Sequence, residues 1–180
     1  MNTGYKIIRG KVLVLLVAGH NYPQLRGGNL KSSDLYTGKL VEKLASKTKS
    51  WAIISEEIQL DPNWYSQSPF RLKVKQLIKD NDIKAVFDIH GKKDSDNLIE
   101  VYPNKNFKKL FTSSLSGFLL KNFKDNDQLT ISEDLGRTNI PSLEVEIRKD
   151  GRIPGTKENQ EILSLLSNLL IKVVSFLSKN

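Results

Sequence analysis

The sequence predicts an α/β fold in which a mixed, mostly parallel sheet lies between two layers of helices. Short, strongly apolar runs alternate along the chain with longer segments whose apolar residues recur every three or four positions. The run 12–18 is apolar throughout, as expected of a strand that helices cover on both faces. With 180 residues, of which 38% are apolar, the chain can form one well-buried domain, and we expect a single domain over residues 1–180.

The same patterns predict the elements in order. Strands are expected at 12–18, 51–55, 84–90, 98–102 and 142–148, with a further short strand at 129–131. Helices are expected at 34–47, 69–79, 107–123 and 158–178, and loops or turns at 19–33, 61–68, 136–141 and 150–155. Ser33 or Asp34 can cap the first helix, and Pro69 suits the first turn of the second.

Composition narrows the possible functions. The absence of cysteine excludes a disulfide scaffold, a thiolate nucleophile and any Cys-ligated metal site, and it fits a cytoplasmic protein. The net charge of +8 could attract nucleic acid or a carboxylate-bearing substrate. Because no aromatic-basic nucleic-acid motif accompanies it, we favour a lysine-rich solvated surface. The apolar C-terminal helix is interrupted by polar residues, so we expect it to pack on the sheet and not to contact a membrane. The oligomeric state is not predicted.

The two histidines of the chain both lie at predicted strand ends. His20 follows the run 12–18, and His90 ends the run 84–90. Because ligands bind beyond the carboxyl ends of parallel strands, we expect both rings at the functional edge. Two histidines and one carboxylate form a known zinc set, for which Asp34 and Asp88 are alternative acidic ligands.

Two glutamates offer a general base. Glu144 and Glu146 share one face of the predicted strand 142–148, and such doubled carboxylates suit proton transfer to or from water. The same alternation is also typical of the solvent face of an edge strand.

The order of these motifs resembles a known family. The strand ending in His20 is followed by Arg26 and Asp34-Leu-Tyr-Thr-Gly-Lys-Leu, then by Phe87-Asp-Ile-His-Gly91, and finally by Ile140-Pro-Ser-Leu-Glu-Val-Glu-Ile147. Spread over residues 12–150, this order resembles the N-formylglutamate amidohydrolase-like branch of the zinc carboxypeptidase superfamily.

That resemblance implies a phosphorylase/hydrolase-like fold with one zinc ion. By position, His20, Asp34 and His90 would be the ligands and Glu146 the catalytic carboxylate. Pro23 stands where carboxypeptidases place a Glu ligand. The branch commonly has Gln where this chain has Glu144, so the choice between Glu144 and Glu146 as base stays open.

The sequence thus predicts a zinc-dependent amide hydrolase that acts on an N-acyl amino acid or small peptide. Zinc would activate a water, a glutamate would take its proton, and Arg26 or Arg137 would bind the substrate carboxylate. The alternatives are a non-catalytic basic binding protein on the same fold, with nucleic acid or an acidic partner, a metal-independent enzyme that uses both histidines, and a membrane-surface protein.

Overall fold

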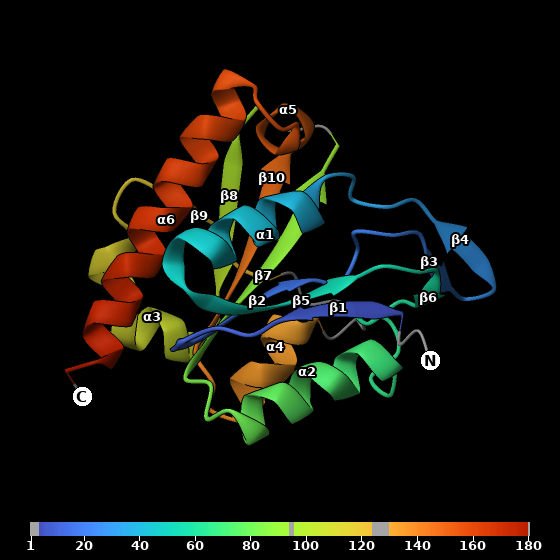
Figure 1. Ribbon diagram of the computed structural model, residues 1–180, viewed down its shortest axis with the longest axis horizontal. Helices are drawn as coiled ribbons and strands as arrows, with labels where there is room; N and C mark the ends of the chain where they lie inside the picture. Colours follow the sequence, from blue (N-terminus) through green and yellow to red (C-terminus); the bar gives the residue numbers. More distant parts are fainter. Residues whose placement is uncertain (1–3, 94–95, 124–129, 180) are drawn as a thin grey trace.

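A computed structural model describes residues 4–93, 96–123 and 130–179, and within them a seven-stranded sheet forms the centre of the molecule (Figure 1). In spatial order its strands are β1 (Tyr5–Ile8), β5 (Ser50–Ser55), β2 (Val12–Ala18), β7 (Ala85–Lys92), β10 (Ser142–Arg148), β8 (Ile99–Pro103) and β9 (Leu119–Leu120). The four central strands β5, β2, β7 and β10 run parallel, whereas β1 and β8 run antiparallel to their central neighbours. The expected mixed, mostly parallel sheet is therefore confirmed.

Helices cover both faces of this sheet (Figure 1). One face carries α1 (Thr37–Thr48), α6 (Lys157–Leu177), α3 (Lys105–Phe111) and the 3-10 helix η1 (Thr112–Leu115). The other face carries α2 (Pro69–Asp80) and α4 (Ile131–Arg137). Strand β2 is continuously apolar because both of its faces are buried. Leu16 packs into the first core and Leu15 into the second. The predicted three-layer α/β architecture is confirmed.

Helix α1 begins later than expected, and Asp34 does not cap it. The residue before the helix is Tyr36, which has a left-handed backbone with φ of 72° and no side-chain capping bond. The Asp34 side chain is instead turned toward the two histidines. Asp34, a residue type that often caps helices, therefore contacts the two histidines and does not cap α1.

The segment after α3 departs most from expectation. Instead of one helix over 107–123, α3 ends at Phe111, η1 follows, and Gly117 adopts a φ of 90° before the short strand β9. The predicted strand 129–131 is also wrong where it can be assessed. Its residue 129 lies outside the described residues, and Ile131 begins α4 behind a capping box formed by Thr130 and Glu133.

The predicted turn 136–141 and loop 150–155 are partly helical. Gly136 lies inside α4, and α5 (Lys149–Arg152) occupies the start of the expected loop. Both helices are short, with too few residues to show a periodic apolar pattern.

A small second sheet stands beside the main one, where the sequence indicated only loops (Figure 1). It consists of β3 (Gln24–Arg26), β4 (Asn29–Lys31) and β6 (Gln59–Leu60). Gly27 and Gly28 form its hairpin turn with φ of 55° and 81°, a conformation that glycine adopts without strain. These strands are too short to produce a readable alternation.

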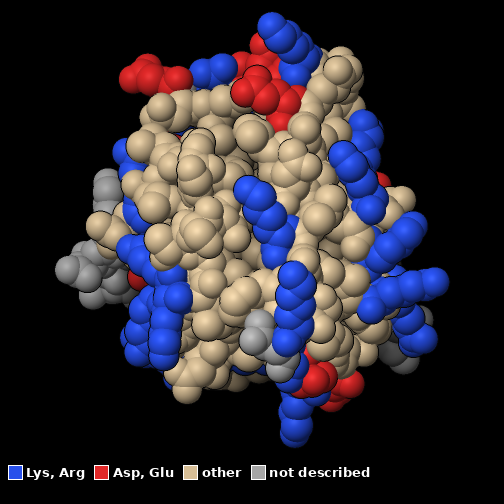
Figure 2. Space-filling model, turned by 90° about the vertical axis from the view of Figure 1, so that its left-hand side faces the viewer, with Lys and Arg blue, Asp and Glu red and all other residues tan. Residues whose placement is uncertain are grey.

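Helix α6 is long and apolar enough, by length and composition alone, to cross a membrane. In the folded chain one of its faces joins the core beneath it, through Ile162, Leu166, Leu169, Leu170 and Val173. On the side of the molecule that carries α6, Lys and Arg side chains occur at both edges and along the centre, with uncharged surface between them (Figure 2).

Candidate metal centre

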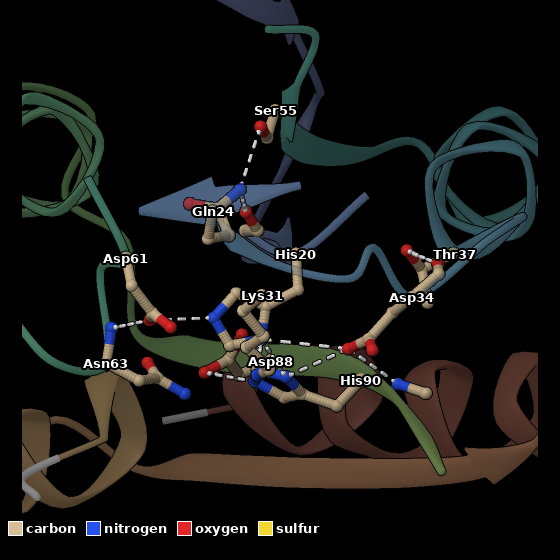
Figure 3. A network of polar contacts seen from close by, with 12 residues as sticks. His20, Gln24, Lys31, Asp34, Thr37, Ser55, Asp61, Asn63, Asp88 and His90 are labelled. Atoms are coloured by element: carbon tan, nitrogen blue, oxygen red, sulfur yellow. Dashed lines mark hydrogen bonds and ion pairs between the residues drawn. The ribbon is translucent and has the colours of Figure 1, made fainter. Parts of the chain in front are cut away.

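The two histidines meet at the carboxyl edge of the sheet. Strands β2 and β7 are parallel neighbours, with Val17 opposite Asp88, so His20 just beyond β2 comes beside His90 near the end of β7. The two ring centroids are 4.8 Å apart, and the two Nδ1 atoms are 3.1 Å apart (Figure 3). Both side chains are buried, at 2% and 4% exposure.

Asp34 completes this group. Its Oδ2 lies 3.6 Å from the Nδ1 atom of each histidine. The Gly91 amide donates a hydrogen bond of 3.0 Å to the same oxygen, and the Asp34 amide donates one of 2.7 Å to the His20 carbonyl. The first bond holds the carboxylate against β7, and the second holds the backbone of Asp34 against the segment that follows β2.

Each imidazole also faces a second carboxylate through its other nitrogen. His20 Nε2 lies 2.9 Å from Asp61 Oδ1, and His90 Nε2 lies 3.1 Å from Asp88 Oδ2. Arg26 holds Asp61 Oδ2 through Nε and Nη2, at 2.8 and 2.6 Å. A carboxylate at Nε2 favours the proton on that nitrogen and leaves Nδ1 as the electron donor.

This arrangement fits a divalent metal ion. If both Nε2 atoms carry protons, two Nδ1 lone pairs and one carboxylate oxygen converge within 3.1–3.6 Å, and the Lys31 ammonium group approaches His20 Nδ1 to 3.3 Å. Such a group of electron donors attracts a cation. Donor atoms at neighbouring corners of a tetrahedral zinc site with bonds of 2.0–2.1 Å are about 3.3 Å apart, which matches the observed separations. We conclude that His20, Asp34 and His90 can hold a divalent metal ion, and Asp88 lies behind them at Nε2 of His90.

The charges of this group perturb its pKa values. Burial opposes ionisation of Asp34 and Asp61, but hydrogen bonds and charge from the histidines outweigh it and lower the pKa of both carboxyls. Burial likewise opposes protonation of His90, yet the Asp88 charge and the bond to Asp34 raise the pKa of that ring well above its usual value. The pocket therefore stabilises positive charge at His90.

Glu144 and Glu146 lie on the adjacent strand β10. Glu146 pairs in register with His90, and Glu144 pairs with Asp88, so all four side chains are on the same face. Burial raises the pKa of Glu144 to about 7, and it also raises the pKa of Glu146, which is partly exposed. Both carboxyls therefore hold a proton at higher pH than an ordinary glutamate does.

A pocket of about 410 Å³ opens over these residues. Besides His20, Asp34, His90, Glu144 and Glu146, its wall includes Arg26, Lys31, Ser32, Asn63, Gly91, Lys93 and Thr130. Lys31 reaches furthest in, with its Nζ 3.3 Å from His20 Nδ1. Three of the basic residues of the chain thus face the carboxyl groups of the site.

The two arginines predicted to bind substrate are separated. Arg26 lines the pocket and contacts Asp61, with its guanidinium 5.4 Å from the centre of the Trp64 ring. Arg137 ends α4 and lines a different hollow, with Lys105 and Lys108. The structure therefore brings Arg26 to the histidines but not Arg137.

Sequence reasoning missed Asp61 and Lys31. Asp61 follows β6, and Lys31 ends β4, and both strands belong to the small sheet that no pattern predicted. Their only sequence signal was their position in polar loops near strand ends.

Arg152 supports the site from behind Gly91. It is 4% exposed, and it donates from Nη1 to the Leu35 carbonyl at 2.5 Å and from Nε to the Ile147 carbonyl at 3.1 Å. A Cβ atom at Gly91 would lie 2.4 Å from its Cζ atom, so only glycine fits between this guanidinium and Asp34.

No family model matches this chain, and no curated protein matches it in sequence. Solved structures do match in three dimensions. A gene product of Agrobacterium tumefaciens superposes with a TM-score of 0.68, at 15% identity over 97% of this chain and 96% of that one. A bacteriophage poly-gamma-glutamate hydrolase gives 0.57, at 13% identity over 96% and 91%. The N-formylglutamate amidohydrolase of Ralstonia eutropha gives 0.55, at 10% identity over 98% and 99%.

The fold is that of these hydrolases. The resemblance seen in the sequence motifs is therefore confirmed at the level of the fold.

Proposed function

We propose that this protein is a zinc-dependent amide hydrolase that acts on an N-acyl amino acid or a small peptide. The observation that carries the proposal is the convergence of His20 Nδ1, His90 Nδ1 and Asp34 Oδ2 in a pocket that also contains a buried glutamate, Glu144, and a partly exposed one, Glu146. Hydrolases that share the fold, one named for poly-gamma-glutamate and one for N-formylglutamate, support an amide substrate.

His20, Asp34 and His90 would hold the zinc ion. When bound, zinc supplies a Lewis acid that polarises a carbonyl group and lowers the pKa of water. Asp61 pairs with Nε2 of His20 and keeps the proton on that nitrogen, and Asp88 lies 3.1 Å from Nε2 of His90, so that both Nδ1 atoms face the ion.

Glu146 is the general base in this proposal. It lies opposite His90 in the strand register, is partly exposed and lines the pocket, so its carboxylate can accept a proton from the attacking water. The same carboxyl group can then donate that proton to the leaving nitrogen. Glu144 lies deeper, opposite Asp88, with its Oε2 inaccessible to water.

The basic residues of the pocket suit a substrate with a carboxylate. Lys31 and Lys93 line the pocket, and Arg26 presents a guanidinium group at its rim while its Nε and Nη2 atoms hold Asp61. Charge-assisted hydrogen bonds from such groups would orient the carboxylate and leave the amide facing Glu146.

The test combines metal analysis with a substrate screen. Purified protein should bind zinc after dialysis and hydrolyse members of a panel of N-acyl amino acids. His90→Ala should lose zinc, and Glu146→Gln should retain zinc but lose turnover. Glu42→Gln, on the exposed face of α1, is the control and should behave as the wild type. Full zinc retention by His90→Ala, or unchanged turnover by Glu146→Gln, would refute the assignment.

A further inference from the structure

A second group of potential ligands lies behind the proposed zinc site. Asp88, His90 Nε2 and Glu144 offer one donor atom each, and these atoms all lie within 4.8 Å of one another. The three residues are 0%, 4% and 8% exposed. His90 belongs to both groups, because its Nδ1 faces the pocket and its Nε2 faces this inner cluster.

The polar atoms of the inner cluster are not satisfied. Both oxygens of Asp88, Nε2 of His90 and Oε2 of Glu144 are inaccessible to water and have no hydrogen-bond partner among the described residues. Within those same ranges, no Lys or Arg forms an ion pair with Asp88 or Glu144. Buried carboxylates without a partner are strongly unfavourable, and such atoms call for an ion or water between them.

The geometry favours an ion over a direct hydrogen bond. Asp88 Oδ2 and His90 Nε2 are 3.1 Å apart, yet they do not meet the angular requirements of a hydrogen bond. In a hydrogen bond the acceptor lies along the N–H direction. Around a metal ion two ligands occupy neighbouring corners, about 3.3 Å apart for zinc, and neither atom points at the other.

We propose that Asp88, His90 Nε2 and Glu144 form a second site for a divalent metal ion of the zinc class. The mixed nitrogen and carboxylate donors suit such an ion better than magnesium or calcium, which prefer oxygen ligands. His90 links the two sites, and the inner ion takes the place of the proton on Nε2. This site goes beyond the proposed single-ion hydrolase, and it makes Glu144 a ligand, so that Glu146 is left to act as the base.

The experiment counts zinc per chain. Wild-type protein and four variants are equilibrated with buffered free zinc and analysed by atomic emission, with circular dichroism as a check on folding. The wild type should bind two equivalents. Asp88→Asn and Glu144→Gln, which remove one anionic ligand without changing size, should each bind one. His20→Ala should also bind one, and the surface control Glu42→Gln should bind two.

Cobalt titration of the wild type provides a measurement that depends on no variant. Two successive equivalents, each with its own visible absorption, are expected. Saturation at one equivalent, or two zinc equivalents retained by both Asp88→Asn and Glu144→Gln, would overturn the inner site. A single equivalent that is lost in His20→Ala would overturn it while leaving the proposed hydrolase intact. A wild type that binds no zinc would overturn both proposals.

Discussion

Gly91 is the position where the smallest change should disturb the site most. In Gly91→Ala the new Cβ would lie 2.4, 2.5 and 2.7 Å from Cζ, Nη1 and Nη2 of Arg152, whereas ordinary contacts begin at 3.4 Å. The guanidinium must therefore move by about 1 Å. It is buried and held by the carbonyls of Leu35 and Ile147, so it has little room to move.

The expected cost follows from this clash. Overpacking a buried site costs about 1–3 kcal/mol. Breaking one hydrogen bond of a charged group adds about 1.5–3 kcal/mol, because the partner carbonyl is left buried. We expect a total of about 4 kcal/mol, which for a chain of this size lowers Tm by roughly 8–16 °C. Zinc affinity should fall as well, since the Gly91 amide also donates to Asp34.

Thermal and urea unfolding of four proteins would test the reasoning: the wild type, Gly91→Ala, Arg152→Met and the double variant. Arg152→Met should itself destabilise the fold, because it leaves two buried carbonyls unpaired. If the clash is the cause, adding Gly91→Ala to Arg152→Met should cost much less than it does in the wild type. Equal losses in both backgrounds, or a Tm of Gly91→Ala within about 1 °C of the wild type, would refute it.

Three further predictions concern Asp61, which lies behind the site, and Phe107, which lies in the core. Asp61→Asn should weaken zinc binding about 10–100-fold, measured by competition with a chelator, because His20 loses the charge that orients it. The pKa of Asp61 is lowered in the folded state, so its ionised form stabilises the protein fully above the unfolded pKa of about 3.9 and this contribution is lost as the pH falls further. Urea unfolding of Asp61→Asn should accordingly depend less on pH in acid than the wild type does; an identical profile would contradict this. Phe107→Ala should cost about 3–5 kcal/mol in the same assay, because the side chain is fully buried against Phe87 and Phe111.

The sequence predicted the elements whose pattern is long and repetitive. Strand β2 has the bounds expected from its apolar run and β10 those expected from its alternation of apolar and charged residues, and α2 and α6 differ from expectation by a residue or two. Short elements failed because three residues, as in β3, cannot show a period. The helix expected over 107–123 was wrong because the chain tightens into the 3-10 helix η1 after Phe111, and Gly117 then turns it away with a φ of 90°.

The site residues at strand ends could be predicted from the sequence, whereas those in the loops could not. His20 and His90 were predictable because the parallel strands of a sheet place their carboxyl ends at one edge. The role of Asp34 was ambiguous, since an aspartate before a helix is usually its cap. Only the folded structure shows that its side chain contacts His90 and does not cap α1. Asp61 depends on the pairing of β6 with β3, a contact between distant segments that no local pattern encodes.

The bond between the Asp34 amide and the His20 carbonyl closes the chain segment 21–33 at its base. Within this segment Arg26 is tied to Asp61 and Lys31 to His20, whereas the hairpin turn 27–30 is exposed. Replacing the turn 27–30 with a different or longer one should therefore change which molecules reach the pocket, while Arg26 and Lys31 keep their contacts with the site. The protein is on this account a natural scaffold for loop grafting.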